Sequence, residues 1–204
     1  MDKQYVMLCK PNRSEIVIKK SRFIASVSPV NNEEEAANFI QQIKEEHKQA
    51  THNVFAYVIN EQIQRYSDDG EPSGTAGRPV LEVINNKGLV KTAVVVTRYF
   101  GGIMLGAGGL VRAYTEAAVL GIEEAGIAVK TLHQQLHITV DYNLFGLVKK
   151  IIEQNQGRHV EIAYEQHVKI SAYFLSKVAQ SITRELIDAT AAQVTIEKGK
   201  ETYI

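Results

Sequence analysis

Acidic and hydroxyl side chains are concentrated in one short segment, RYSDDGEPSGTAGRP, which spans residues 65–79. The carboxylates of Asp68, Asp69 and Glu71 could bind magnesium or move protons. The same residue types also hydrogen-bond to backbone amides, and glycine permits backbone conformations closed to other residues, so the segment could instead be a rigid turn. Both interpretations are open from the sequence alone.

Glycine dominates a second segment, GGIMLGAGG, at residues 101–109. It joins a β-branched run to a helix-like run, and the exposed amides at the start of a helix favour an anion such as phosphate. The known phosphate-binding fingerprints fail, because Val111 stands where Gly-x-Gly-x-x-Gly needs glycine and Ala107 where a P-loop needs lysine. Arg98 and Arg112 flank the segment and could supply positive charge. Tight packing of a helix on a sheet also requires glycine, so this alternative stays open.

Catalytic templates are weak in this chain. No Gly-x-Ser-x-Gly motif surrounds Ser73, because the preceding glycine lies three residues before it, and no His-Glu-x-x-His motif is present. Among the six histidines, only His52 precedes a strand whose hairpin leads to the acidic segment. It could form an acid–base pair or a metal site there, but a hydrogen-bonded structural histidine is favoured because no second nitrogen ligand is evident. We expect no metal and no cofactor.

Composition is that of an ordinary folded protein and excludes some partners. Of the 204 residues, 45% are hydrophobic and 23% are charged, and lysine plus arginine balance aspartate plus glutamate at 23 each. Nucleic acid could therefore bind only at a local basic patch. The single cysteine, Cys9, excludes an internal disulfide. The start lacks an apolar signal region and no stretch is long enough to span a membrane, so we expect a cytoplasmic protein without a membrane partner.

Strand and helix patterns alternate in the first half of the chain. Strands are expected at residues 5–8, 15–19, 23–27, 53–59, 62–66 and 89–97. A turn is expected at residues 11–14. Asn31 or Asn32 should cap a first helix, whose first turn is acidic. Pro79 should begin a second helix, and Leu110 a third whose small and apolar face packs closely on a sheet.

A second domain is expected after a boundary at residues 130–132, which separates residues 1–130 from residues 131–204. The pattern predicts in order a strand, a helix, two paired strands, a helix and a strand, at residues 136–142, 144–154, 159–164, 168–174, 176–189 and 194–198. Ser176 should cap the second of these helices. This βαββαβ order is the ferredoxin-like pattern, so the predicted fold class is α+β with two domains.

Four segments of the first half resemble the IMPACT/YigZ family. They are SRFIA at residues 21–25, ATHNVFAYVI at residues 50–59, RYSDDGEPSGTAGRPVL at residues 65–81 and VVVTRYFGGIMLGAGGLVRAY at residues 94–114. These segments are long and follow the order of the family, and the second half is similar to the small C-terminal domain of its bacterial members. One position departs from the family. Its members usually have lysine in the glycine turn where this chain has Met104, so the chain lacks a cation there.

The resemblance implies a fold and a class of function. The first domain would share the fold of the second domain of a small-subunit ribosomal protein, which also occurs in a translocase domain and in small-molecule kinases. The second domain would be similar to late domains of elongation factor G. Eukaryotic relatives regulate translation by binding an activator of the kinase that senses amino-acid starvation. RNA, the ribosome or a translation factor is therefore the expected partner.

Two classes of function are open at this point. A binding protein would place its arginines on phosphates, whereas an uncharacterised enzyme would hold a phosphorylated small molecule in the glycine segment and use the acidic residues for magnesium or protons. The lack of a nucleophile–base pair and of a lysine in the glycine segment favours binding. In either class the candidate site residues are His52, Arg65, Ser67, Asp68, Asp69, Glu71, Ser73, Thr75, Arg78, Arg98, Tyr99, Gly101, Gly102, Gly106, Gly108, Gly109 and Arg112.

Two geometric expectations follow from these patterns. The segments at residues 68–79 and 101–109 both follow strands of one domain, so they should meet at the same edge of its sheet. Gly102 and Gly108 should need a positive φ or a close backbone approach, in which case a β-branched replacement would cost at least about 1–2 kcal/mol.

Overall fold

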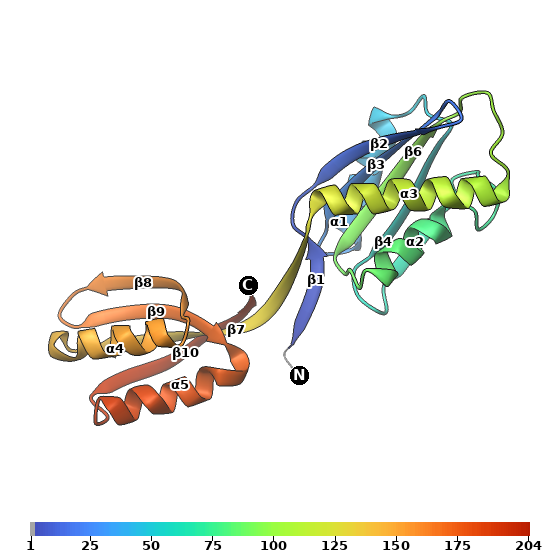
Figure 1. The fold of residues 1–204 in the computed structure, drawn as a ribbon. Coiled ribbons are helices and arrows are strands. Elements are labelled where there is room, and N and C mark those ends of the chain that lie inside the picture. Colours follow the sequence, from blue (N-terminus) through green and yellow to red (C-terminus); the bar gives the residue numbers. More distant parts are fainter. Residues whose placement is uncertain (1–2) are drawn as a thin grey trace. The chain divides into compact units, whose positions relative to one another are not determined.

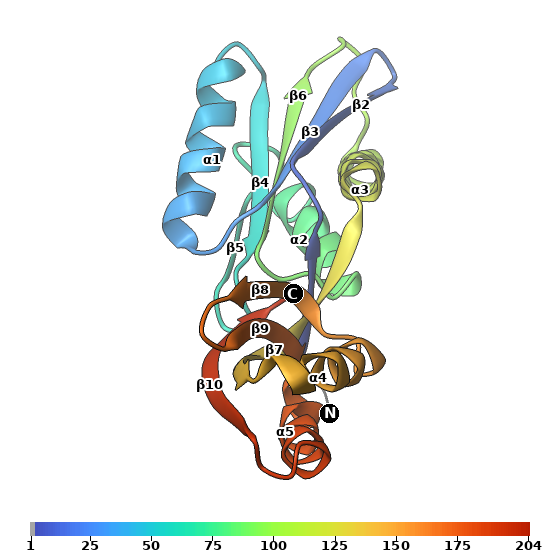
Figure 2. The same ribbon diagram turned by 90° about the vertical axis from the view of Figure 1, so that its left-hand side faces the viewer.

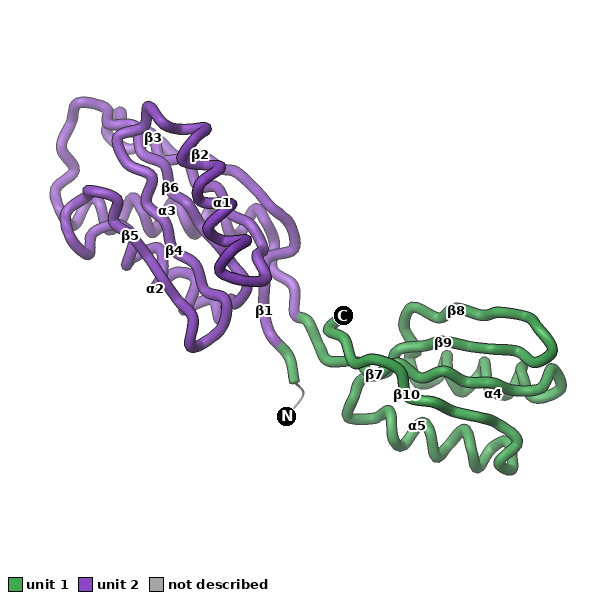
Figure 3. The backbone as a smooth tube through the Cα atoms, turned by 180° about the vertical axis from the view of Figure 1, so that it is seen from behind, with its two compact units in different colours: residues 1–4, 130–204 green, residues 5–129 purple. Residues whose placement is uncertain are grey.

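The computed structural model describes residues 3–204 and divides the chain into two compact units, coloured separately in Figure 3. One unit contains residues 5–129, and the other contains residues 130–204 with the N-terminal residues up to Gln4. The chain passes between the units in two neighbouring strands, β1 (Gln4–Leu8) and β7 (Ile127–Val140). Each unit has its own sheet and its own buried apolar core.

The first unit is built on a five-stranded antiparallel sheet. Its strands lie in the order β2 (Asn12–Ile18), β3 (Ser21–Pro29), β6 (Thr92–Tyr99), β4 (His52–Val58) and β5 (Gln64–Ser67). The central strand β6 has the sequence TAVVVTRY and is buried over its first seven residues. Its run of β-branched side chains suits a strand that is covered on both faces.

Helices cover both faces of this sheet (Figures 1 and 2). Helix α1 (Glu33–Glu46) lies on one face and buries Ile40 and Ile43 against β4 and β6. Helices α2 (Gly77–Asn86) and α3 (Ala107–Ala125) share the core of the opposite face. Helix α3 approaches the sheet closely at Gly121, where an added Cβ atom would lie only 3.0 Å from that of Ala25.

The second unit has the element order β7, α4 (Tyr142–Gln154), β8 (Arg158–Tyr164), β9 (Val168–Leu175), α5 (Ser176–Ala189) and β10 (Val194–Tyr203). Strand β10 pairs with β7, β7 with β9 and β9 with β8, all antiparallel. Both helices pack on the same face of the sheet, as Figure 1 shows. Residues of β9 accordingly alternate between buried and more accessible side chains along the strand.

The predicted fold class is confirmed, since the chain forms a two-unit α+β protein whose second unit has the βαββαβ order. Asn32 caps α1 by accepting a hydrogen bond from the amide of Glu35 at 2.8 Å. Helix α2 begins at Gly77, two residues before Pro79. The amides in the first turn of a helix make no intrahelical hydrogen bond, so proline is tolerated at any position of that turn. Its presence therefore does not identify the first residue of the helix.

Three local predictions are wrong. Residues 12–14 belong to strand β2 rather than to a turn, because they pair with β3. Gly108 and Gly109 lie inside helix α3, which begins at Ala107 and not at Leu110. Ser176 is the first residue of α5 and makes no capping hydrogen bond, so its hydroxyl does not perform the role expected of it.

Candidate functional site

The two chemically distinctive segments meet at one edge of the first sheet. Strand β4 lies between β5 and β6 and runs antiparallel to both, so its beginning lies beside their ends. The acidic segment follows β5 and the glycine segment follows β6. Residues from both segments line a single cavity of about 400 Å³, together with His52 at the beginning of β4. The expected meeting of the two segments is therefore confirmed.

A buried ion pair holds the two segments together. Nη1 of Arg98 lies 2.7 Å from Oε1 of Glu71, and these two side chains are only 7% and 3% exposed. The hydroxyl of Tyr114, on α3, donates to the same oxygen at 2.8 Å. Burial and the neighbouring carboxylate raise the pKa of this phenol far above its usual value, so it remains a neutral donor. Strand β6, the acidic segment and α3 are thus joined at one carboxylate.

Aromatic rings and one serine complete the surroundings of Arg98. Its guanidinium lies 5.4 Å from the ring centroids of both Phe23 and Phe100. Nη2 of Arg98 donates to the hydroxyl of Ser21 at 3.5 Å, and that hydroxyl also accepts from the amide of Gly101 at 3.1 Å. Arg98 is therefore part of the buried framework that anchors the glycine segment. Its burial argues against the phosphate contact that its position in the sequence suggested.

Asp68 shapes the acidic segment from within. Its carboxylate accepts hydrogen bonds from three backbone amides, those of Gly74 at 2.9 Å, Ala76 at 3.1 Å and Gly77 at 2.8 Å. The hydroxyl of Thr75 donates to a carbonyl of the same segment at 2.6 Å. These contacts close the turn that leads into α2. The carboxylate satisfies amides that would otherwise have no partner at this bend.

Asp69 ties the acidic segment to its neighbours. One carboxylate oxygen accepts from the amide of Asn53 at 2.6 Å, and the other lies 2.9 Å from Nζ of Lys44. Its own amide donates to the hydroxyl of Ser67 at 3.1 Å. Asp69 also has a positive φ of 47°, which its short polar side chain tolerates. Of the two interpretations of this segment, its hydrogen bonds therefore favour the rigid turn over a magnesium site.

His52 is hydrogen-bonded through one ring nitrogen and faces Glu71 with the other. Nδ1 lies 2.7 Å from the carbonyl oxygen of Asp69, and a carbonyl can only accept, so Nδ1 carries the hydrogen. Nε2 lies 3.9 Å from Oε2 of Glu71, which is too far for a direct hydrogen bond. In the neutral ring Nε2 is an acceptor, so two acceptors face each other at the cavity.

The glycine segment needs glycine at some positions and not at others. Gly102 and Gly106 have positive φ values of 82° and 72°, which disfavour a side chain. A Cβ atom at Gly101 would overlap the backbone of Lys20. The prediction for Gly108 is wrong, because this residue is helical and an added Cβ would meet only Nη1 of Arg112, at 3.9 Å.

Apolar side chains are exposed on the glycine segment. Phe100 and Ile103 are about half exposed, and Met104 is 83% exposed. We call residues 100–104 the apolar loop. Its base is held by the bond between Gly101 and Ser21, and its apolar side chains are exposed rather than buried in the core.

The predicted arginines do not form a basic patch. Arg65 lies 3.2 Å from Glu33 and Arg78 lies 3.0 Å from Glu82, in exposed ion pairs. Arg112 is exposed and has no ion-pair partner among residues 3–204. Because Arg98 is buried, only one of these four arginines has a free guanidinium on the described surface. A single phosphate contact contributes little affinity for a nucleic-acid backbone.

Other candidate residues lie away from the cavity, and one of its key residues was not predicted. Ser73 is exposed, and the hydroxyl of Tyr99 lies 2.9 Å from Nδ1 of His47. Tyr114 was expected only on the packed face of α3. Helical spacing correctly indicated that Tyr114 is buried. Because the hydroxyl of a buried tyrosine needs a hydrogen-bond partner, the sequence could also have indicated that this residue contacts a polar group.

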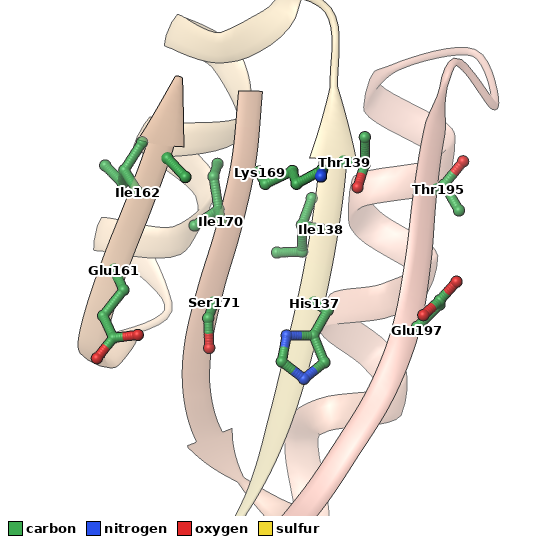
Figure 4. Close-up of a pocket in the computed structure, with 11 residues that line it drawn as sticks. His137, Ile138, Thr139, Glu161, Ile162, Lys169, Ile170, Ser171, Thr195 and Glu197 are labelled. Carbon is green, nitrogen blue, oxygen red and sulfur yellow. The ribbon is translucent and has the colours of Figure 1, made fainter. Parts of the chain in front are cut away.

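A second hollow, of about 450 Å³, lies on the face of the second sheet that carries no helix (Figure 4). Strand register places Glu197 beside His137, His137 beside Ser171, and Ser171 beside Glu161. Lys169, also on this face, lies 2.7 Å from Glu165. The face is therefore polar and carries carboxylates, which does not favour a nucleic-acid backbone.

Residues 3–204 contain neither a membrane-spanning helix nor a metal-binding cluster of side chains. No helix there is long and apolar enough to cross a membrane. Nor do those residues contain a group of three or more histidine, cysteine, aspartate or glutamate side chains that could hold a metal ion.

Family profiles match both halves of the chain. The profile of the Impact N-terminal domain matches residues 19–122, and that of a domain of unknown function, DUF1949, matches residues 138–193. A solved structure, described as the crystal structure of an hypothetical protein, is similar with a TM-score of 0.63 and 28% identity over 96% of this chain and 97% of that chain.

Relatives that share this similarity occur in bacteria and in eukaryotes. IMPACT family member YvyE of Bacillus subtilis (strain 168) is 42% identical over 98% of this chain and 93% of that protein. IMPACT family member YigZ of Escherichia coli (strain K12) is 33% identical over 80% of this chain and 82% of its own length. The Protein IMPACT homolog of Dictyostelium discoideum is 37% identical, over 43% of this chain and 27% of that protein.

Removing the Asp68 carboxylate should unfold the turn before α2. We expect Asp68→Ala to lower the free energy of unfolding by roughly 2–4 kcal/mol, because three amides lose their acceptor. Glu61→Ala is the control, since this exposed side chain makes no such contacts, and it should change stability by less than about 0.5 kcal/mol. Chemical unfolding followed by circular dichroism measures both. Equal effects of the two variants would contradict the role assigned to Asp68.

Two glycines of the same segment should respond in opposite ways to a methyl group. Gly101→Ala should destabilise the protein by ~1–3 kcal/mol or more, because the added atom overlaps the backbone of Lys20. Gly108→Ala should be neutral or stabilising by up to ~1 kcal/mol, because the position is helical and open. Thermal melts of both variants decide the matter, and a loss of stability for Gly108→Ala alone would refute this assignment.

Proposed function

Because the chain belongs to the IMPACT family, we propose that it is a translation-linked binding protein that contacts the ribosome or a translation factor. The translational role is the one that the family resemblance implies. The proposal assigns the protein to the cytoplasm, where that machinery works. Its contact surface is the apolar loop, residues 100–104, together with the exposed first turns of α3.

One observation carries the proposal, namely the exposure of apolar side chains on an anchored loop. Met104 is 83% exposed beside Ile103 and Phe100, in a segment whose base is fixed by buried polar contacts. A surface that is already ordered loses little conformational entropy when it binds. Exposed apolar side chains from one short segment are also the kind of anchor that protein interfaces use.

Charge favours a protein surface over bare RNA as the partner. Arg65 and Arg78 are engaged by carboxylates, and Arg98 is buried. Arg112 alone would contribute only a weak, salt-dependent attraction to phosphate. The net charge of the whole chain is zero, which gives no general attraction to nucleic acid.

Phosphoryl chemistry with magnesium receives less support. The carboxylates of Asp68 and Asp69 already accept hydrogen bonds from backbone amides, and Glu71 is paired with Arg98. Magnesium usually keeps several waters and binds one or two carboxylates that are free to coordinate it. The acidic segment supports the loop instead, so binding is the better interpretation of this site.

A charged side chain on the apolar loop should disrupt the contact. We expect Met104→Asp to weaken binding to purified Bacillus subtilis ribosomes, or to purified initiation and elongation factors, by at least about tenfold, which is ~1.4 kcal/mol. Val17→Asp is the matched control, because Val17 is an exposed apolar residue on β2, and it should bind normally. Co-sedimentation and pull-down titrations at constant salt measure both.

Two outcomes would overturn the proposal. One is the absence of saturable binding to ribosomes and to every factor tested. The other is saturable binding to bulk RNA that Arg112→Ala weakens and Met104→Asp leaves unchanged, with a salt slope reduced by about 0.7–0.9 per lost phosphate contact. That second result would replace the protein interface with an RNA interface.

A further inference from the structure

The cavity between the two segments contains hydrogen-bond acceptors that lack a donor. Nε2 of His52 and Oε2 of Glu71 face each other at 3.9 Å, while Oε1 of Glu71 accepts from Arg98 and Tyr114. A neutral His52 whose Nδ1 donates to the carbonyl of Asp69 has an acceptor at Nε2. A donor placed between these two atoms could reach both of them within normal hydrogen-bond distances.

The same cavity contains donors that lack an acceptor. Arg98 lines the cavity and brings a positive charge to it, which its ion pair with Glu71 partly offsets. Gly106 and Ala107, at the start of α3, line the cavity, and no side chain caps this 19-residue helix. The first amides of a helix have no intrahelical acceptor and carry the positive end of its dipole. An anionic group would satisfy these amides.

The remaining walls are apolar, and the space is large enough for a metabolite. Pro72, Phe100, Met104, Leu105 and Leu110 line the cavity around the polar atoms. Its volume of about 400 Å³ lies within the range of ~300–1,000 Å³ that small-molecule sites occupy. An apolar body with polar groups at one end would fit these surroundings.

We infer that this cavity is a binding site for a small carboxylic acid that also carries an amino or hydroxyl group and an apolar side chain. The carboxylate would accept from the first amides of α3. An amino group would donate to both Nε2 of His52 and Oε2 of Glu71, and a hydroxyl group would donate to one of them. The apolar side chain would lie against Phe100 and Leu105. This site lies within the first unit and shares Phe100, Met104 and the start of α3 with the proposed contact surface, but its ligand can be tested without any partner.

Four related compounds test each part of the assignment. L-leucine and its 2-hydroxy analogue carry both polar groups, 4-methylpentanoate lacks the donor, and 3-methylbutylamine lacks the carboxylate. We expect saturable binding of at least one of the first two to the full-length protein, and at least about tenfold weaker binding of the last two. Amide NMR shifts should move at Gly70, Gly106 and Ala107, which line the cavity. A preference between the first two distinguishes an amino acid from a hydroxy acid.

Glu71→Gln tests the acceptor pair without removing the contacts around it. The amide oxygen can still accept from Arg98 and Tyr114, whereas the amide nitrogen that replaces Oε2 can no longer accept from the ligand's donor. We expect at least about tenfold weaker binding of the probe. Glu82→Gln, at an exposed ion pair of the same unit, is the control and should leave the affinity unchanged.

Ala107→Pro tests the anion end by an independent route. Proline is tolerated at the first position of a helix and removes one amide there, so α3 should still form while the carboxylate loses a donor. Probe binding should weaken about threefold or more, with an unchanged melting temperature. The inference is overturned if none of the four compounds binds saturably, or if folded Ala107→Pro and Glu71→Gln bind the probe as the native protein does.

Discussion

The buried pair of Arg98 and Glu71 is the interaction on which the arrangement of the first unit's sheet edge depends. Arg98 lies near the end of the central strand β6, Glu71 lies in the acidic segment, and Tyr114 of α3 shares the same carboxylate. Breaking a buried pair by removing one partner typically costs ~3–5 kcal/mol, because the remaining charge is left without compensation. Separating any of these elements from the others would leave the charge of Arg98 or of Glu71 buried without its partner. Both members of this pair line the cavity.

The acidic segment and the glycine segment have different structural roles at the site. The acidic segment uses Asp68 and Asp69 to bind its own amides and those of its neighbours, so its carboxylates support the loop. The glycine segment instead provides positive φ values at Gly102 and Gly106, which let the backbone turn and display Met104. Rigid support and an exposed apolar surface thus come from neighbouring segments with different chemistry. The binding surface and the small-molecule cavity share Phe100 and Met104, which are exposed and also line the cavity.

Hydrophobic periodicity and capping residues predicted most elements of the fold. They did not predict which charged residues pair in the folded chain. The β-branched run of β6 and the cap at Asn32 are local signals, and both indicated the observed structure. Residues 12–14 look like a turn by composition, but pairing with β3 extends the strand through them. Gly108 resembles a loop glycine only because the start of a helix cannot be located within a glycine-rich run. The sequence places Arg98 beside the glycine segment, whereas its burial depends on Glu71, which lies 27 residues away in the chain.

The central claim is that Arg98 couples the two segments, and native-state amide hydrogen exchange measures this most directly. Arg98→Met keeps an apolar stem of similar length and removes the partner of Glu71, while Arg112→Met makes the same change at an exposed, unpaired arginine. The account predicts that exchange rises together at residues 68–77 and 100–106 in Arg98→Met and stays at native rates in Arg112→Met. Faster exchange in only one of the two segments, or in neither, would contradict it.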